Sequence, residues 1–295
     1  MLEEKLFQEL REKVRPALIL ESRKLEKFLG FSILIASESF QHTGSFKFRA
    51  ALNVVLNSSA RHFVTISSGN FGQALAYACY LERRNCTILM PLTSAKVKVD
   101  AVKSFGARVE LVDIKEKSRD QWLKEFLSKV EDKVETVSPY DDYRVIEGNS
   151  SLTCDLALLG DSFDTVVVPI GGGGLASGLV NGFQRNGIKV RIIGAEPEMA
   201  NDASLSFKSG NLVGLEQEPM TIADGARTLK LGDKNWEILK SGLEDIFVVG
   251  EKEIENAVKL YFDYANLKVE PTGALSLAAV IKNRDYFQSR KTLCI

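Results

Sequence analysis

The sequence predicts an α/β protein with two doubly wound lobes, each built around a parallel sheet. Three observations lead to this fold class. From Arg61 onward, short runs rich in β-branched residues alternate with helical patterns, and a second series of the same kind begins at Thr165. Parallel strands need long crossover connections, and the helical segments supply them. The length of 295 residues leaves room for two moderate domains.

The first series makes the smaller lobe, which we place at residues 52–141. Its strands are expected at residues 62–68, 86–90 and 108–113, and its helices at 71–84, 94–106 and about 116–130. Each strand is a short apolar run, and each helical pattern is long enough to cross back over a sheet.

The second series and the beginning of the sequence make the larger lobe, which we place at residues 1–51 and 142–295. Its strands are expected at residues 165–170, 189–196, 245–250 and 291–295, and its helices at 175–187, 251–266 and 273–283. In open α/β folds, ligands gather where the strands end. The segments that follow each strand are therefore the places where functional residues are sought.

The composition excludes several classes of function. Hydrophobic residues make up 45% of the chain and charged residues 26%, as in ordinary folded proteins, which argues against disorder. The 38 Lys and Arg residues nearly balance the 39 Asp and Glu residues, and no dense basic run is present. The chain therefore lacks the positive field that nucleic acid or an anionic membrane requires.

Targeting signals and reactive residue types are also scarce. The first residues are charged and amphipathic, unlike a secretory signal, so we expect a cytoplasmic protein. The longest charge-free stretch, residues 165–184, contains Pro169 and four consecutive glycines and predicts no membrane span. The four cysteines form no CxxC pair, which predicts reduced thiols. Two histidines are too few for His-rich zinc sites and argue against most Ser-His-Asp schemes.

A glycine loop follows the first strand of the second series. Gly171, Gly172, Gly173 and Gly174 stand directly before a predicted helix. Without side chains, backbone N–H groups can converge on an anion, and a helix N-terminus adds about half a positive charge. A plain glycine turn is the alternative, although four glycines are costly for a turn alone. The loop lacks the spacing of a dinucleotide site or a P-loop, which favours a small phosphorylated cofactor.

Two further turns follow strand-like runs. Ser67, Ser68, Gly69 and Asn70 lie between a strand and a helix, where their hydroxyls and amides suit a substrate carboxylate. The Asn70 side chain also suits a ring oxygen. The same residue types are ordinary helix caps, and this alternative stays open for the segment taken alone. Gly225 lies in the third turn, where a glycine permits close approach of a ligand.

One lysine has an unusual setting. Lys47 is flanked by Phe46 and Phe48 and preceded by Gly44 and Ser45. A partly desolvated lysine amine is a useful nucleophile and forms a Schiff base with an aldehyde. The alternative from the local pattern is a helix lysine whose stem lies along apolar surface while its ammonium reaches water.

Together these segments resemble the pyridoxal-phosphate enzymes of fold type II, which share the tryptophan synthase β-subunit-like fold, and among them the serine/threonine dehydratase and serine racemase family. The resemblance covers nearly the whole chain. It depends on eight motifs in the family's order: GSFKFRAA, SSGNFGQALA, MP followed by KVKVDAVKSFGA, PYDDYRVIEG, VVVPIGGGGL, GAEP, TIADG and EPTGA. Eight motifs in register favour the functional interpretation of each one over its structural alternative.

The resemblance implies a lyase that uses pyridoxal 5'-phosphate to convert L-threonine or L-serine into a keto acid and ammonia. Serine racemase and 3-hydroxyaspartate dehydratase are the alternatives. Lys47 would bond the cofactor and then act as the base that removes the α-proton of the substrate. The expected substrate is a small hydroxylated amino acid, and the expected assembly is a homodimer.

The resemblance also assigns the remaining site residues. It implies that Gly171–Gly174 hold the cofactor phosphate and that Phe46, Asn70 and Gly225 lie beside the cofactor ring. It implies that Ser67–Asn70 bind the substrate carboxylate. Within that segment, Ser68 matches the serine that serves the opposite face of the substrate in the racemases, which leaves racemisation open.

The segment GAEPEMANDA matches the family's divalent-cation site. The match implies Glu196, the Ala200 carbonyl and Asp202 as ligands. Oxygen ligands of this kind suit Mg²⁺, Ca²⁺ or Mn²⁺. An acidic surface loop is the alternative.

The sequence departs from the family pattern in three places. Phe71 stands where the family usually has His, and residues 148–151 read GNSS where many members read GQGT. The family's last strand runs on to a Ser, Thr or Cys that meets the pyridine nitrogen, whereas this sequence ends at Ile295, with Cys294 as the nearest candidate. We therefore expect a truncated chain or an incomplete pocket wall. A non-catalytic descendant that binds cofactor or amino acid remains the alternative from another class.

Overall fold

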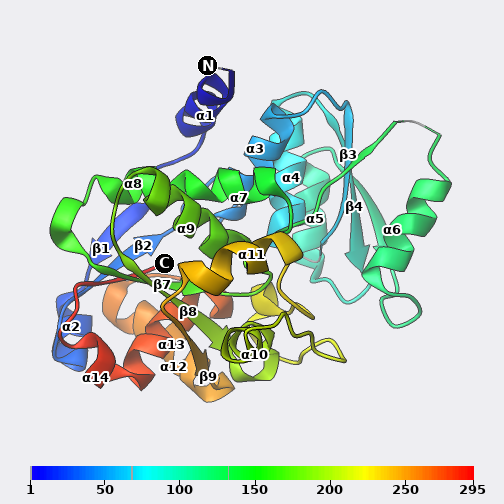
Figure 1. The fold of residues 1–295 in the computed structure, drawn as a ribbon. Helices are drawn as coiled ribbons and strands as arrows, with labels where there is room; N and C mark the ends of the chain where they lie inside the picture. The colour runs from blue at the N-terminus through cyan, green and yellow to red at the C-terminus, as the bar shows by residue number, and fades with distance from the viewer. Residues whose placement is uncertain (1, 68, 132) are drawn as a thin grey trace. The chain divides into compact units, whose positions relative to one another are not determined.

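Two sheets organise the chain, each in its own packing unit, in a computed structural model that describes residues 2–67, 69–131 and 133–295 (Figure 1). Unit 1 consists of Met1–Arg15 and Gln41–Asn149, and unit 2 of Pro16–Phe40 and Ser150–Ile295. The predicted α/β class with parallel sheets is confirmed.

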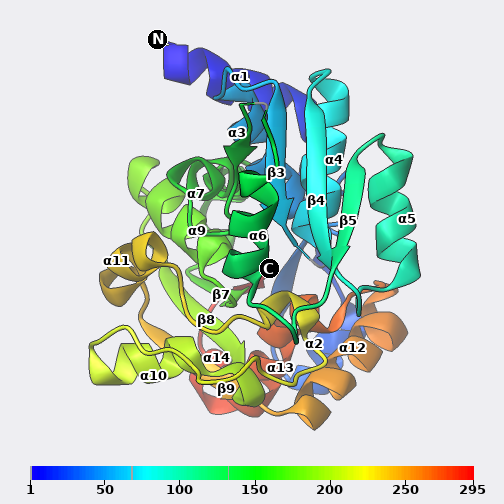
Figure 2. The same ribbon diagram turned by 90° about the vertical axis from the view of Figure 1, so that its right-hand side faces the viewer.

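Unit 1 contains a four-stranded sheet in the order β5-β4-β3-β6, in which every pairing is parallel. The strands are β3 (His62–Ile66), β4 (Asn85–Pro91), β5 (Arg108–Val112) and β6 (Glu135–Thr136). The helices are α1 (Leu2–Lys13), α3 (Lys47–Leu56), α4 (Asn70–Leu81), α5 (Lys96–Ser104), α6 (Arg119–Ser128) and α7 (Tyr143–Ser150). Figure 2 shows β3, β4 and β5 side by side.

Both faces of this sheet are covered. Successive strand residues point to opposite faces. Phe63 and Ile88 therefore join the core that includes α3 and α4, whereas Val64 and Leu89 join a second cluster with Trp122 of α6. Burial on both faces explains why the strands read as continuous apolar runs.

Unit 2 contains a six-stranded sheet in the order β1-β2-β10-β7-β8-β9, parallel except for the β1–β2 pair. The strands are β1 (Leu18–Glu21), β2 (Ile33–Ser37), β7 (Thr165–Pro169), β8 (Arg191–Pro197), β9 (Asp245–Val249) and β10 (Thr292–Cys294). The helices are α2 (Arg23–Leu29), α8 (Leu152–Ala157), α9 (Gly174–Arg185), α10 (Asp202–Ser209), α11 (Asp233–Gly242), α12 (Glu251–Ala265), α13 (Leu275–Lys282) and α14 (Arg284–Phe287), with short turns η1 (Gly160–Ser162), η2 (Glu198–Ala200), η3 (Asp224–Ala226) and η4 (Pro271–Ala274).

Helices also cover both faces of the second sheet. Val167, Ile193 and Cys294 pack in one core with residues of α2, α12 and α13. The neighbouring residues Val166 and Val168 are fully buried, and α9 contacts β7 and β8. This arrangement puts the glycine loop between β7 and α9 at the carboxyl end of a central strand.

Among the differences between the structure and the expected elements, two have a clear local reason. The charged helix expected at residues 116–130 spans Arg119–Ser128, because Ser118 and Gln121 form a capping box that fixes its start. The antiparallel β1–β2 pair is not foreseen by the sequence pattern. Strand β1 has only four residues and is exposed at both ends, and its short apolar run lies outside the alternating series that begins at Arg61.

The packing units divide the chain elsewhere than the expected lobes. Residues 41–51 and 142–149 pack in unit 1. One reason is the close approach of α7 to α3, where a Cβ on Gly148 would lie 2.5 Å from the Arg49 carbonyl oxygen. The lobe boundaries given above stay a prediction. No helix in the described part of the chain has the length and apolarity needed to cross a bilayer.

Candidate functional site

Lys47 is the first residue of α3 and is half-buried. Its Nζ donates a hydrogen bond to the Pro139 carbonyl oxygen at 3.0 Å. The same nitrogen lies 5.0 Å from the ring centroid of Phe46 and 5.9 Å from that of Phe71. A cation here sits at the positive end of the helix dipole, which favours negative charge. The Pro139 carbonyl and the two aromatic rings fix the position of this amine at the start of α3.

The Phe71 departure has a clear structural result. The Phe71 side chain is 2% exposed and packs in the core of unit 1 with Phe48 and Leu75. An aromatic ring therefore faces the Lys47 amine where the family usually has a polar imidazole. The substitution makes the surroundings of this amine more apolar.

The Ser67–Asn70 segment connects β3 to α4. Ser67 is buried, and its Oγ accepts hydrogen bonds from the N–H groups of Gly69 at 3.4 Å and Gly72 at 3.1 Å. This hydroxyl therefore holds the start of α4, which is the capping role that the sequence leaves open. Asn70 is the first residue of α4, and Ser68 lies outside the described residues. Substrate binding by this segment stays a prediction.

Lys98 is a candidate site residue that the sequence analysis misses. A Cβ built on Gly69 would lie 3.1 Å from Lys98 Nζ, so the ammonium of α5 stands beside the Ser67–Asn70 segment. A cation there adds attraction for a carboxylate. The KVKVDA motif could have indicated this role. Strands β3 and β4 are parallel, so the first turn of the helix after β4 lies at the same edge of the sheet as the end of β3.

The glycine loop of unit 2 presents buried N–H groups at the start of α9. Gly173 is the N-cap, with φ of 92°, and no side chain caps the helix. The first bond of the helix is donated by Ser177 N–H to the Gly173 carbonyl. Across the described residues, no acceptor is recorded for the N–H groups of Gly173, Gly174 and Leu175, all buried. Buried N–H groups normally have partners, so this cradle fits a phosphate.

Close packing explains two of the four glycines. A Cβ on Gly171 would lie 2.9 Å from both Ala226 Cα and the Gly225 carbonyl oxygen. A Cβ on Gly173 would lie 2.8 Å from Asn235 Cβ, and its left-handed φ also favours glycine. The structure thus brings two predicted site residues, Gly171 and Gly225, into contact.

Two hydrogen bonds fix the walls of this loop. Asn235 Nδ2 donates to the Gly172 carbonyl at 2.9 Å, which holds the loop against α11. Gly225 N–H donates to Thr272 Oγ1 at 2.9 Å, which ties η3 to η4. The EPTGA motif therefore acts through its threonine, which positions the turn that touches the glycine loop.

The three predicted metal ligands at the end of β8 are buried, although Glu198 and Met199 between them are exposed. Glu196 is fully buried and accepts hydrogen bonds from the N–H groups of Ala203 at 2.9 Å and Ser204 at 2.8 Å. Burial, and then the charge of Asp202, raise the pKa of Glu196 well above its usual value. Ala200 lies between them in η2 and is also buried.

Asp202 is the predicted metal ligand whose surroundings best fit that role. It is 1% exposed, and neither carboxylate oxygen has a hydrogen-bond partner of good geometry among the described residues. Burial raises its pKa to about 7. Two carboxylates and a carbonyl are a donor set that suits a hard divalent cation. Within the described residues there is no group of three or more His, Cys, Asp and Glu side chains that could hold a metal.

Cys294 lies in the core of unit 2. Its Cα pairs with those of Ile35 and Val167, and its side chain packs in the cluster that contains Tyr261. Burial raises the pKa of its thiol to about 12. The following residue, Ile295, accepts a hydrogen bond from Ser276 Oγ at 2.9 Å.

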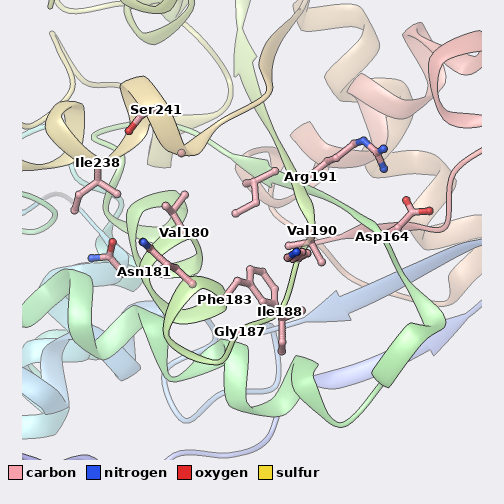
Figure 3. Close-up of a pocket in the computed structure, with 14 residues that line it drawn as sticks. Asp164, Val180, Asn181, Phe183, Gly187, Ile188, Val190, Arg191, Ile238 and Ser241 are labelled. Atoms are coloured by element: carbon pink, nitrogen blue, oxygen red, sulfur yellow. The ribbon is translucent and has the colours of Figure 1, made fainter.

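A pocket of about 900 Å³ lies elsewhere in unit 2, and none of the predicted site residues lines it (Figure 3). Asp164 and Arg191 place it at the amino ends of β7 and β8, whereas the glycine loop follows the carboxyl end of β7. Its walls mix apolar side chains such as Val180 and Ile238 with polar ones. Its position separates it from the glycine loop.

Comparison with known proteins gives consistent results. A family model described as "Pyridoxal-phosphate dependent enzyme" matches residues 10–295. A beta-hydroxyaspartate dehydratase from Paracoccus denitrificans (strain Pd 1222) is 34% identical over 94% of this chain and 88% of that protein. A serine racemase from Arabidopsis thaliana is 35% identical over 94% of this chain and 85% of that protein. The solved structure of maize serine racemase has a TM-score of 0.90 and 28% identity, covering 98% of this chain and 90% of that one.

Proposed function

The chain belongs to the family of pyridoxal-phosphate-dependent enzymes, and on that premise we propose that it is an ammonia-lyase that converts a small β-hydroxy amino acid into a keto acid and ammonia. Water leaves from the β-carbon and is regained when the resulting imine hydrolyses to release ammonia. L-Threonine and L-serine are the substrates we propose first. 3-Hydroxyaspartate is the alternative, supported by the name of the Paracoccus relative. The observation that carries the proposal is the set of buried N–H groups without recorded acceptors at the start of α9.

The glycine loop holds the cofactor phosphate in this proposal. The N–H groups of Gly171–Gly174 bind it, because they are preorganised donors at a helix N-terminus. The resemblance assigns Phe46, Asn70 and Gly225 to the cofactor ring, and we keep that assignment. When bound, pyridoxal phosphate supplies an electron sink for the carbanion formed by loss of the α-proton.

Lys47 has two roles in the proposal. Its amine bonds the cofactor aldehyde, and after release it takes the α-proton of the substrate. The half-buried position, the neutral Pro139 carbonyl at 3.0 Å and the two neighbouring rings support both roles.

The substrate carboxylate binds, in the proposal, to the Ser67–Asn70 segment. Backbone N–H groups at the start of α4 provide the hydrogen bonds. The Lys98 ammonium beside Gly69 adds charge attraction. When the carboxylate is held in place, the Cα–H bond of the substrate points toward the Lys47 amine. This orientation selects the Cα–H bond as the one that is broken.

We further propose that Glu196, the Ala200 carbonyl and Asp202 bind Mg²⁺, Ca²⁺ or Mn²⁺. The near-complete burial of Asp202 beside the buried carboxylate of Glu196 supports this assignment. A homodimer and the lobe boundaries given above complete the proposal and rest on the resemblance.

The test is a screen for keto-acid release from L-threonine, L-serine and 3-hydroxyaspartate, with and without added pyridoxal phosphate and Mg²⁺. We expect turnover of at least one of them and a visible absorption band from the bound cofactor. The Lys47→Ala variant should lose both, whereas Lys124→Ala, at an exposed lysine of α6, should keep both. A band that persists in Lys47→Ala contradicts the assignment of Lys47. Tight cofactor binding without any turnover favours the non-catalytic descendant.

Racemisation of serine is the second candidate, and the 35% identity to the Arabidopsis serine racemase favours it. It needs an acid or base on the face of the substrate opposite Lys47, a role for which Ser68 is the candidate. Chiral analysis of the products from L-serine separates the two activities. D-Serine that disappears in Ser68→Ala, while keto-acid release is retained, supports the racemase.

A further inference from the structure

A second, polar pocket of about 370 Å³ lies in unit 1, far from the glycine loop along the sequence. It is lined by Arg61, Glu82, Arg83, Arg84 and Asn85. These residues stand at the amino ends of β3 and β4. The Ser67–Asn70 segment follows the carboxyl end of β3, so the pocket lies at the opposite end of the same strand.

Backbone hydrogen bonds bring the three arginines together. The Asn85 N–H donates to the Arg61 carbonyl at 2.8 Å, which joins the residues before the two strands. The Arg84 N–H donates to the Cys79 carbonyl at 2.8 Å, which closes the turn after α4. Arg83 adopts a φ of 52°, in the left-handed region where glycine is the ordinary residue. The turn thus holds a long cationic side chain at a position where the backbone would accept glycine more readily.

The pocket contains one acid, and that acid already has a partner. Glu82 Oε1 lies 2.6 Å from Lys13 Nζ, a lysine that Glu82 shares with Glu9 at 2.7 Å. No ion pair is recorded for Arg61, Arg83 or Arg84 in the described parts of the chain. Three like charges with no recorded counter-charge repel one another, and an anion would relieve this repulsion.

The arginine side chains do not serve as a cap for the end of α4. The carbonyls of Ala78, Cys79 and Tyr80 accept backbone N–H groups from Glu82, Arg84 and Arg83. The last turn of the helix is therefore satisfied by the main chain. The guanidinium groups remain available for a ligand that enters the pocket.

We propose that this pocket binds the phosphate group of a small phosphorylated molecule, at a site distinct from the one that holds the cofactor. Guanidinium forks match phosphate oxygens with paired hydrogen bonds, and three of them suit a dianion. The polar lining and the volume fit a phosphate with a small attached group. The chain as a whole has a net charge of −1, so the attraction is local to this cluster.

The experiment is a calorimetric titration of the whole protein with inorganic pyrophosphate, without added divalent cation. The protein is first saturated with pyridoxal phosphate, so that a phosphate site filled by the cofactor is closed to the probe. We expect one site per chain whose affinity falls as NaCl is raised. Arg84→Gln and Arg61→Gln should each weaken binding about tenfold or more, since each removes a charge-assisted pair.

Arg83→Gly is the most informative variant, because it removes a guanidinium while giving the backbone the residue that its φ favours. It should weaken pyrophosphate binding about tenfold or more with an unchanged or higher melting temperature. The matched control is Arg108→Gln, an exposed arginine at the amino end of β5 that already pairs with Glu110. Binding in this control should stay within about twofold. Absence of binding to the wild type, or wild-type affinity in both Arg83→Gly and Arg84→Gln, overturns the proposal.

Discussion

Replacement of Gly171 by alanine tests how closely the glycine loop must approach η3. The added Cβ would lie 2.9 Å from Ala226 Cα and from the Gly225 carbonyl oxygen. Ordinary contacts begin at 3.4 Å, so each pair of atoms must separate by about 0.5 Å. Both partners belong to the main chain and cannot rotate away. The turn at residues 224–226, held by Thr272, must therefore shift.

Overpacking of this kind costs about 1–3 kcal/mol. For a chain of this size, each kcal/mol lowers the melting temperature by about 2–4 °C. Displacement of the loop should also disturb the N–H groups at the start of α9, so the variant should retain less pyridoxal phosphate after dialysis. The melting temperature and the visible absorption of the bound cofactor measure the two effects separately.

Gly214→Ala is the control for Gly171→Ala. A Cβ at Gly214 would have 3.5 Å contacts with Leu229 and Lys230, which is ordinary packing. The control should therefore stay within about 0.5 kcal/mol of the wild type. If Gly171→Ala melts at the same temperature as this control and keeps its cofactor, the close approach of loop and turn is not required.

Three further outcomes are expected. Burial raises the pKa of Cys294 to about 12, so its thiol stays protonated at mildly alkaline pH. Alkylation, mapped by mass spectrometry, should therefore modify Cys294 only after unfolding. The half-buried Cys154 should be alkylated first. Mg²⁺ should raise the melting temperature of the wild type but not of Asp202→Asn, and an equal rise in both argues against the metal site. Arg83→Gly should raise the free energy of unfolding, measured in urea, by about 0.5–1 kcal/mol. Glycine relieves a left-handed backbone strain of about 1–2 kcal/mol, which exceeds the entropy that glycine adds to the unfolded chain. A lower free energy of unfolding shows that the arginine side chain supports the turn.

The sequence predicted best those features that depend on local pattern. The glycine loop after β7 follows from a short motif, because four glycines stand directly before a helical pattern. The reasons for individual glycines could not be predicted, because they depend on contacts between distant segments. Gly148 allows α7 to touch α3, and Gly171 allows the loop to touch η3.

Polar side chains were harder to assign than backbone positions. Ser67 was predicted to bind substrate, which stays a prediction, and its Oγ accepts the N–H groups of Gly69 and of Gly72 in α4. A role for Lys98 could not be predicted from its motif, because the distance between Lys98 and Gly69 is set by the packing of α5 beside α4. The arginine pocket could not be predicted, because its residues belong to none of the family motifs.

The position of β10 has a consequence for how the protein is made. This three-residue strand lies between β2 and β7, so it joins residues 33–35 to residues 165–167. During synthesis, the β1–β2 pair cannot join the rest of the sheet until residues 292–294 have been made, because β10 lies between β2 and β7. Contacts that span nearly the whole sequence close slowly. We expect β7, β8 and β9 to associate first on the ribosome, leaving the open edge of β7 as the surface most in need of protection from aggregation until β10 is synthesised.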